Sequence, residues 1–148
     1  MRLLRRLLRE LHSNYKPDES KIIRINNKYF LLEQGQGLHS RKNLVYAGLY
    51  LGQDRRTFEP SAILLQILSK GKDARKVNVD RETAWLFVCG RDVFQENILQ
   101  IEQDLNLGSS YLVMYNGMCL GYGRYETIQG NRMIRNNFNI GDFLHREK

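Results

Sequence analysis

The strongest constraint on the fold is an Asn-Gly pair, Asn116 and Gly117, which separates two runs of strand-forming residues. Residues 111–115 (YLVMY) precede the pair and residues 118–125 (MCLGYGRY) follow it. Asn and Gly tolerate the positive φ angles that a two-residue type I′ turn requires. We therefore predict an antiparallel β-hairpin over residues 111–125.

Five further segments have the composition of strands. Residues 22–25 and 29–32 flank Asn26 and Asn27, which also suit a tight turn between two strands. Residues 44–52 (LVYAGLYLG) contain two glycines, which indicate bulges or a close approach of another backbone segment. Short strands are also expected at residues 77–79 and 132–138.

Helices are expected between the strands. Pro60 suits the first position of a helix that continues through residues 61–69. Asp80 suits the N-cap of a helix over residues 81–89, and Gly90 suits its end. Apolar residues at positions 94, 98, 101 and 105 predict another helix over residues 94–106. Together these segments predict an α+β protein in which a mixed sheet curls into a partial barrel with flanking helices.

The first twelve residues, MRLLRRLLRELH, form an amphipathic helix with leucines on one side and arginines on the other. Four interpretations remain open from the sequence: a docked helix with solvated arginines, a targeting presequence, a membrane-surface helix, or a basic helix on RNA. An apolar core typical of a secretory signal is absent, which argues against secretion.

The chain has 148 residues, enough for one domain with a small appendage, and a net charge of +7 with a pI near 9.6. Residues 1–24 hold seven basic and three acidic groups, and residues 25–57 hold five against two. Residues 58–123 hold six against eight, and residues 124–148 hold five against three. Both ends are therefore basic. If they meet in space, they form a positive face that favours nucleic acid or an anionic membrane as partner.

Several function classes lack their motifs. No P-loop, HExxH motif or clustered Cys/His set occurs, so we predict no enzyme, no cofactor and no metal site. The two cysteines, Cys89 and Cys119, are too few for a disulfide scaffold, and we interpret both as small core residues in a cytoplasmic protein. Phe58, Trp85 and Phe87 are also assigned to the core.

Basic residues interleave with aromatic ones in the predicted strands and turns. Guanidinium groups bind phosphates bidentately and aromatic rings stack on unpaired bases, so this mixture favours RNA over duplex DNA, which is usually read by a helix in the major groove. The residues selected by this pattern are Arg41, Lys42, Arg55, Arg56, Arg124, Arg132, Arg135 and Asn136.

An ordered set of short motifs adds a resemblance. It comprises residues 47–52 (AGLYLG), residues 58–61 (FEPS) opening a helix, a helix at 84–90 ending in Gly, and the Asn-Gly turn followed by residues 120–123 (LGYG). Residues from about 41 to 148 thereby resemble the PUA-like RNA-binding domain of NOL/NOP/Sun-type RNA cytosine methyltransferases. Residues 1–40 resemble, more loosely, the short segment that precedes such domains.

The resemblance implies a pseudo-barrel with flanking helices that binds structured RNA along its first helix, the glycine-containing loop before it and its last strand. Carried over, these places add Gly52, Gln53 and Asn137 to the candidate residues. The chain departs from the family because the cofactor-binding glycine motif and the catalytic Pro-Cys and Thr-Cys pairs are missing, so we expect no methyl transfer by this chain alone. Residues 139–144 (NIGDFL) replace the Pro-Lys-Gly ending of bacterial members.

We therefore predict a stand-alone RNA-binding protein for tRNA or rRNA, with an N-terminal segment over residues 1–40 and a PUA-like domain over residues 41–148. It would act in RNA modification in trans or in ribosome biogenesis, with an RNA methyltransferase or a ribosome-assembly factor as a partner, and without stable membrane association. The alternative is a protein–protein adaptor that docks through the leucine stripe of its first helix.

Overall fold

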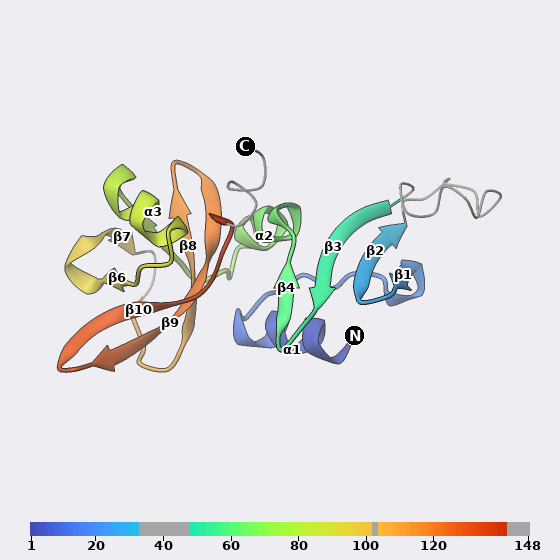
Figure 1. Cartoon of the computed structure of the whole chain (residues 1–148), viewed down its shortest axis with the longest axis horizontal. Coiled ribbons are helices and arrows are strands. Elements are labelled where there is room, and N and C mark those ends of the chain that lie inside the picture. Colours follow the sequence, from blue (N-terminus) through green and yellow to red (C-terminus); the bar gives the residue numbers. More distant parts are fainter. Residues whose placement is uncertain (33–47, 102–103, 142–148) are drawn as a thin grey trace.

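The first half of the chain builds a small antiparallel sheet and a helix that packs against it. The structure is a computed structural model that describes residues 1–32, 48–101 and 104–141. Helix α1 (Arg2–Glu10) and a short 3-10 helix, η1 (Glu19–Lys21), precede the sheet, whose strand order is β1-β2-β3-β4 (Figure 1). Its strands are β1 (Ile22–Ile25), β2 (Lys28–Leu32), β3 (Gly48–Asp54) and β4 (Phe58–Pro60).

The second half forms a six-stranded mixed sheet with the order β6-β10-β9-β8-β5-β7. The elements are α2 (Ala62–Ser69), β5 (Lys76–Val79), α3 (Arg81–Val88), β6 (Val93–Phe94), η3 (Gln95–Asn97), β7 (Ile98–Ile101), β8 (Ser110–Tyr115), β9 (Met118–Ile128) and β10 (Asn131–Asn139). Strands β6 and β7 are the two outer strands of this sheet, yet only the three residues of η3 separate them in the chain. The sheet is therefore curled into a nearly closed pseudo-barrel, and the predicted α+β class with a partial barrel is confirmed.

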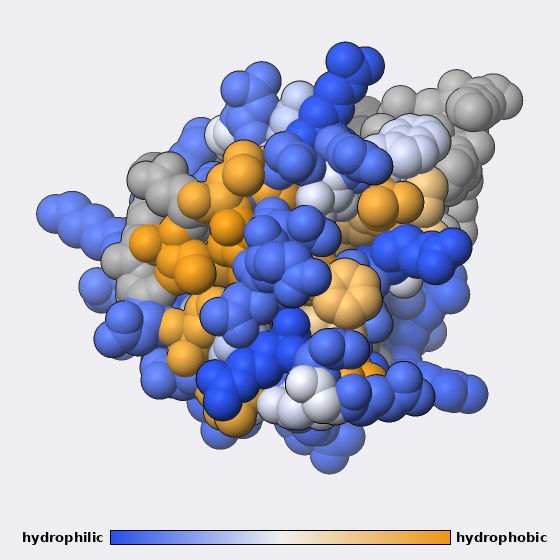
Figure 2. All heavy atoms as spheres, turned by 90° about the vertical axis from the view of Figure 1, so that its left-hand side faces the viewer, coloured by the Kyte–Doolittle hydropathy of each residue, from blue (hydrophilic) through white to orange (hydrophobic). Residues whose placement is uncertain are grey.

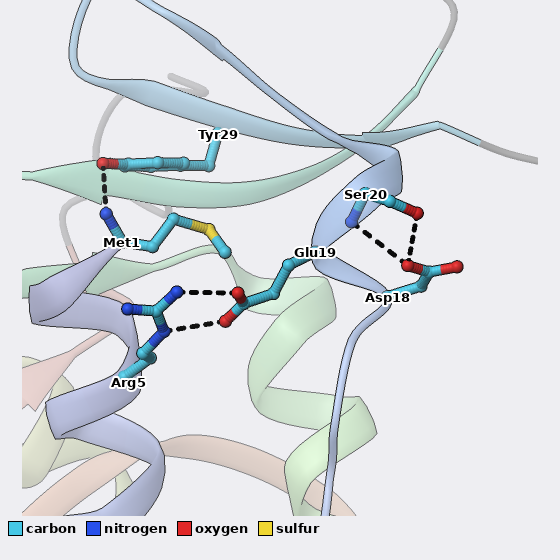
Figure 3. Close-up of polar contacts among 6 residues, drawn as sticks. All are labelled: Met1, Arg5, Asp18, Glu19, Ser20 and Tyr29. Carbon is cyan, nitrogen blue, oxygen red and sulfur yellow. Dashed lines mark hydrogen bonds and ion pairs between the residues drawn. The ribbon is translucent and has the colours of Figure 1, made fainter.

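Helix α1 is docked through its leucines. Leu4, Leu7 and Leu11 are 1%, 4% and 2% exposed and belong to the same hydrophobic cluster as the barrel interior. The Met1 amino group donates to the Tyr29 hydroxyl at 3.2 Å (Figure 3). Two hydrogen bonds of 2.7 and 2.6 Å join the Arg5 guanidinium to the Glu19 carboxylate. The docked interpretation of the first helix is thus confirmed.

The predicted turns and caps are confirmed at several points. Asn116 and Gly117 have φ angles of 49° and 80°, and Asn26 has a φ of 56°. The Asp80 carboxylate accepts from the Thr83 backbone N–H at 2.8 Å and so caps α3. Gly90 has a φ of 99° directly after α3, where a left-handed residue ends a helix.

The predicted helix over residues 94–106 is wrong. This region holds the end of β6, then η3, and then β7, which pairs antiparallel with β5. Phe94 and Ile101, two of the residues that produced the helical period, are each 40% exposed, and Leu99 between them is 66% exposed. The helix-like spacing of these apolar residues therefore arose by chance, because the residues lie in two strands and are not buried along one face of a helix.

Three single-residue predictions also need correction. Pro60 ends β4, and Ser61 is the N-cap of α2, with its Oγ accepting from the Leu64 N–H at 3.0 Å. Trp85 lies on the outer side of α3 and is 61% exposed, whereas Phe58 and Phe87 are buried as expected. Cys89 is exposed, and only Cys119 is a core residue.

Other predictions concern residues outside the described ranges. These are the first part of the strand at 44–52, the domain boundary between residues 40 and 41, and the segment at 142–144. The boundary stays a prediction. None of the helices in the described ranges combines the length and the hydropathy that a transmembrane span needs.

Candidate functional site

A cleft of about 460 Å³ lies between α1 and the paired strands β9 and β10, called the β9–β10 ribbon below. The start of β4 forms its third side. The cleft, as the term is used below, is lined by Leu3, Arg6, Leu7 and Glu10 of α1, Thr57 and Phe58 at the start of β4, Tyr122, Arg124 and Glu126 of β9, and Arg135, Asn136 and Asn137 of β10. Four of the predicted site residues, Arg124, Arg135, Asn136 and Asn137, are therefore brought together here.

Arg124 and Arg135 are direct cross-strand neighbours in the β9–β10 ribbon. Residues opposite each other in an antiparallel pair share one face, and like charges in that position repel. Among the described residues, the two arginines have one ion pair, which is long: 3.6 Å separate Arg135 Nη1 from Glu126 Oε2. The Arg124 Nε atom is buried and has no hydrogen-bond partner among the described residues. An anion in the cleft would relieve the repulsion between the two guanidinium groups.

Arg6 brings a third guanidinium to the cleft from α1. Its Nε donates to Glu10 Oε1 at 3.1 Å, and its side chain is 66% exposed. The three arginines of the cleft thus face two carboxylates, those of Glu10 and Glu126, and the lining has a net positive charge. Because the arginines come from both walls, an elongated anion could contact both.

Asn136 has a structural role at the edge of the cleft. Its side-chain amide donates to the Phe87 and Arg91 carbonyls at 2.7 and 3.0 Å, and its backbone N–H donates to Asp92 Oδ1 at 2.8 Å. These bonds attach the end of α3 to β10. Asn137, next in the chain, is the extra residue of a β-bulge between Asn136 and Phe138, and it is exposed. Asn137 is therefore the more accessible of the two amides.

Tyr122 forms part of the apolar base of the cleft and is 6% exposed. Its ring stacks on Phe138 with centroids 5.7 Å apart. Burial raises the pKa of the Tyr122 hydroxyl, and the carboxylates of Glu10 and Glu59 raise it further. The residue is thus a neutral phenol that supports the cleft, and its ring face is already occupied.

The turn between β3 and β4 brings Arg55 and Arg56 to the rim. Both are exposed and directly precede Thr57, which lines the cleft. Arg55 Nε lies 3.4 Å from Glu59 Oε2, and the Gln53 amide donates to the same oxygen at 3.1 Å. Gln53 therefore holds the turn in place, while Arg56 has no ion pair among the described residues.

Position 52 requires a glycine, because its backbone conformation and its close neighbours leave no room for a side chain. Its φ is 142°, and a Cβ there would lie 2.3 Å from the Glu59 carbonyl oxygen and 2.8 Å from the Phe58 ring. The predicted close approach at this glycine is confirmed, and it lets the β4 backbone and the Phe58 ring pack closely against β3.

Arg132 does not line the cleft, and two predicted residues lie where the structure is not described. Arg132 lies near the tip of the ribbon, opposite Thr127, and the register is continuous from there to Asn136. Because Arg132 and Arg135 are three positions apart, their side chains leave opposite faces of the strand. Arg41 and Lys42 lie outside the described residues.

Sequence reasoning missed Arg6, Glu10, Thr57 and Glu126. The arginine side of the first helix was a usable signal for Arg6, but the site could be identified only once α1 was known to dock beside the ribbon. No group of three His, Cys, Asp or Glu side chains among the described residues could hold a metal ion.

Comparisons with known proteins place the fold. A family model described as UPF0113 PUA domain matches residues 75–148, which include β9 and β10 of the cleft but not α1. A solved structure described as that of a conserved PUA domain protein from Thermoplasma acidophilum aligns with a TM-score of 0.50 and 16% sequence identity, covering 92% of this chain and 89% of the other. No curated protein matches the sequence. A PUA-like domain is thereby confirmed, without the particular link to NOL/NOP/Sun methyltransferases.

Proposed function

Because the chain belongs to the UPF0113 PUA domain family, we propose that it binds structured RNA, with the cleft between α1 and the β9–β10 ribbon as the binding site. The RNA is a tRNA or an rRNA. The protein serves RNA modification in trans or ribosome biogenesis, together with a separate RNA methyltransferase or ribosome-assembly factor, in the cytoplasm.

One observation carries the proposal: Arg124 and Arg135 stand side by side on one face of the ribbon. A folded protein that needed only stability would gain from opposite charges at these positions. A phosphate backbone supplies the missing negative charge, and the planar guanidinium groups can bind phosphate oxygens bidentately.

The mechanism of recognition is electrostatic and geometric. Arg6 from α1 and the arginine pair of the ribbon contact phosphates from two sides, while Arg55 and Arg56 reach RNA that passes over the rim. The base of the cleft is made of Tyr122 and Phe58, both buried, so it offers no free aromatic face for stacking. The fold therefore selects the shape and charge of the RNA backbone more than particular bases.

The adaptor alternative does not survive in its predicted form. It required an accessible leucine stripe on the first helix, whereas Leu4, Leu7 and Leu11 are buried in the core. The membrane-surface interpretation of the same helix fails for the same reason.

The test compares two variants that alter arginines on opposite faces of the β9–β10 ribbon. Affinity for total tRNA and for rRNA is measured by filter binding at low salt. The double variant Arg124→Gln/Arg135→Gln should bind at least about tenfold more weakly, since two phosphate contacts are lost. The control Arg132→Gln removes one charge from the opposite face and should stay within about twofold of the wild type. Unaltered thermal melts would show that both variants remain folded.

Two results would overturn the proposal. One is the absence of binding to either RNA at low salt. The other is a loss of binding free energy per removed charge that is as large in Arg132→Gln as in the double variant, because an effect of net charge alone does not distinguish the two faces.

A further inference from the structure

Trp85, the one tryptophan of the chain, is 61% exposed on the outside of α3. Leu86 beside it is 43% exposed. A large aromatic side chain on a helix surface is a position where partners commonly bind, because it adds much apolar contact area for little conformational entropy. Figure 2 views the end of the molecule that carries α3, β6 and β7, and apolar side chains gather there between polar ones.

Trp85 forms one wall of an apolar groove of about 400 Å³ between α3 and the strands β8 and β9. The α3 groove is lined by Arg81, Ala84, Trp85, Val88, Tyr115 and Leu120. Arg81, Trp85 and Val88 follow one another at four and three positions, so they lie along one side of the helix. The lining is almost wholly apolar, so Arg81 lines the groove through the aliphatic part of its side chain.

The groove is held rigidly by bonds on two sides. Asn136 attaches the end of α3 to β10 through the Phe87 and Arg91 carbonyls. The Gln66 side chain of α2 exchanges two hydrogen bonds with the Cys119 backbone, at 2.9 and 3.0 Å, next to Leu120 in the base of the groove. A groove that is already formed costs little ordering on binding, which favours a specific occupant.

The chemistry of the lining selects among possible occupants. A nucleobase would leave its polar edge unpaired against Ala84, Val88 and Leu120, which is unfavourable. A second copy of this chain would bring two molecules of net charge +7 together. Arg81 is exposed, and no ion pair is recorded for it among the described residues. A partner with an apolar side chain next to a carboxylate could fill the groove and pair with the Arg81 guanidinium at the same time.

We propose that the α3 groove binds an acidic protein segment, with an apolar side chain of that segment packed against Trp85 and a carboxylate paired with Arg81. The groove shares no residue with the cleft, and Figure 1 shows α3 at the upper left of the molecule and α1 at its lower centre. The proposal therefore does not depend on RNA binding, and both sites can be occupied at once.

The experiment selects binders from a displayed library of random 12-residue peptides, using the full chain as bait. The selected peptides are expected to combine large apolar residues with Asp or Glu. Their affinities are then measured by the change in fluorescence of Trp85 and, for variants, by titration calorimetry. Trp85→Ala should weaken binding at least about tenfold, and Arg81→Glu about fivefold or more.

Two controls make the result decisive. Leu86→Ala removes an exposed apolar residue from the same helix outside the groove and should leave affinity unchanged. Replacing the acidic residues of a selected peptide by Lys should restore its binding to Arg81→Glu and abolish its binding to the wild type. All three variants alter exposed side chains, so their thermal melts should match the wild type.

The proposal is overturned if the selected peptides lack acidic residues, or if their binding is insensitive to Trp85→Ala. It is also overturned if no peptide is selected. Self-association of the wild type, which Trp85→Ala abolishes, would assign the groove to a second copy instead. Quenching of Trp85 by RNA that persists in Arg124→Gln/Arg135→Gln would assign it to nucleic acid.

Discussion

The cleft and the α3 groove are two hollows of one molecule with opposite chemistry. The cleft brings three arginines and two carboxylates around a small apolar base, whereas the groove is apolar with a single cation. Strand β10 connects them, because Asn136 lies at the edge of the cleft and holds the end of α3. The difference shows that the arginines are unevenly placed: three line the cleft and one lines the groove, which is why we propose a polyanion for the first and a protein segment with an apolar anchor for the second.

The two cysteines give the largest expected contrast between the outside of α3 and the barrel interior. Cys89 is exposed at the end of α3, while Cys119 is fully buried and burial raises the pKa of its thiol to about 12. A thiol-specific reagent at neutral pH should therefore modify Cys89 on the order of a thousandfold faster, since Cys119 reacts only after unfolding. Mass spectrometry over time measures both rates. Comparable rates would contradict the buried position of Cys119.

Gly123→Ala should destabilise the pairing of β9 with β10. These strands form one wall of the cleft, and β10 holds the end of α3 through Asn136. A Cβ at Gly123 would lie 2.1 Å from the Arg135 carbonyl oxygen and 2.6 Å from Ile134 Cγ2, inside the β9–β10 ribbon. We expect the free energy of unfolding to fall by about 3 kcal/mol, the upper range for overpacking. Gly71→Ala is the control, because its Cβ would meet nothing closer than 3.4 Å. Urea denaturation compares the two. Equal stabilities would contradict the close pairing of the ribbon.

Removing the carboxylates of the cleft should strengthen RNA binding. Glu10 and Glu126 each pair with a cleft arginine, so Glu10→Gln/Glu126→Gln frees two guanidinium groups for phosphates. We expect about a three- to tenfold gain in affinity at low salt. The control Glu82→Gln/Glu96→Gln makes the same change in net charge at exposed positions that do not line the cleft. A similar gain in both double variants would show that net charge, not the cleft, controls binding.

The smallest expected effect is on stability at acid pH, and it concerns the contact that attaches α1. Helix α1 forms one wall of the cleft and takes no part in the α3 groove. Hydrogen bonding from Arg5, with its positive charge, lowers the pKa of the Glu19 carboxyl. A carboxyl with a lowered pKa stabilises the fold above its unfolded pKa, about 4.3, and this contribution is lost as pH falls through the folded pKa. The melting temperature of the wild type should therefore drop more steeply below about pH 4.5 than that of Glu19→Gln.

Part of this acid dependence should remain in the variant. The pKa values of Asp18 and Asp80 are lowered too, by hydrogen bonds from Ser20 and from Thr83 respectively. Identical pH profiles for the wild type and Glu19→Gln would show that the Arg5–Glu19 contact does not hold α1 in solution.

The sequence predicted well those features that depend on a few neighbouring residues. The Asn-Gly turn, the Asp80 cap with Gly90, and the leucine stripe of α1 were all identified because local sterics and one-sided hydrophobicity decide them. Residues 94–106 were mispredicted because an exposed apolar outer strand happens to share the period of a helix. Trp85 was assigned to the core, although its position on α3 faces outward and its side chain is 61% exposed.

The cleft was predicted only in part, because it depends on long-range placement. Arg124 and Arg135 were recognised as candidates, but their pairing follows from the register of β9 with β10. Arg6 joins them only because α1 docks beside the ribbon. Arg132 shows the opposite case, since it belongs to the same strand and yet the alternation of strand side chains directs it to the other face.

The dependence of RNA affinity on salt tests the central claim most directly. With about five phosphates contacted, log K should fall with log salt at a slope near −4, and in Arg124→Gln/Arg135→Gln the slope should shrink by about 2. The wild-type slope should be retained in Arg132→Gln. A flat response in the wild type, or an unchanged slope in the double variant, would contradict the assignment of the arginine cleft as the RNA-binding site.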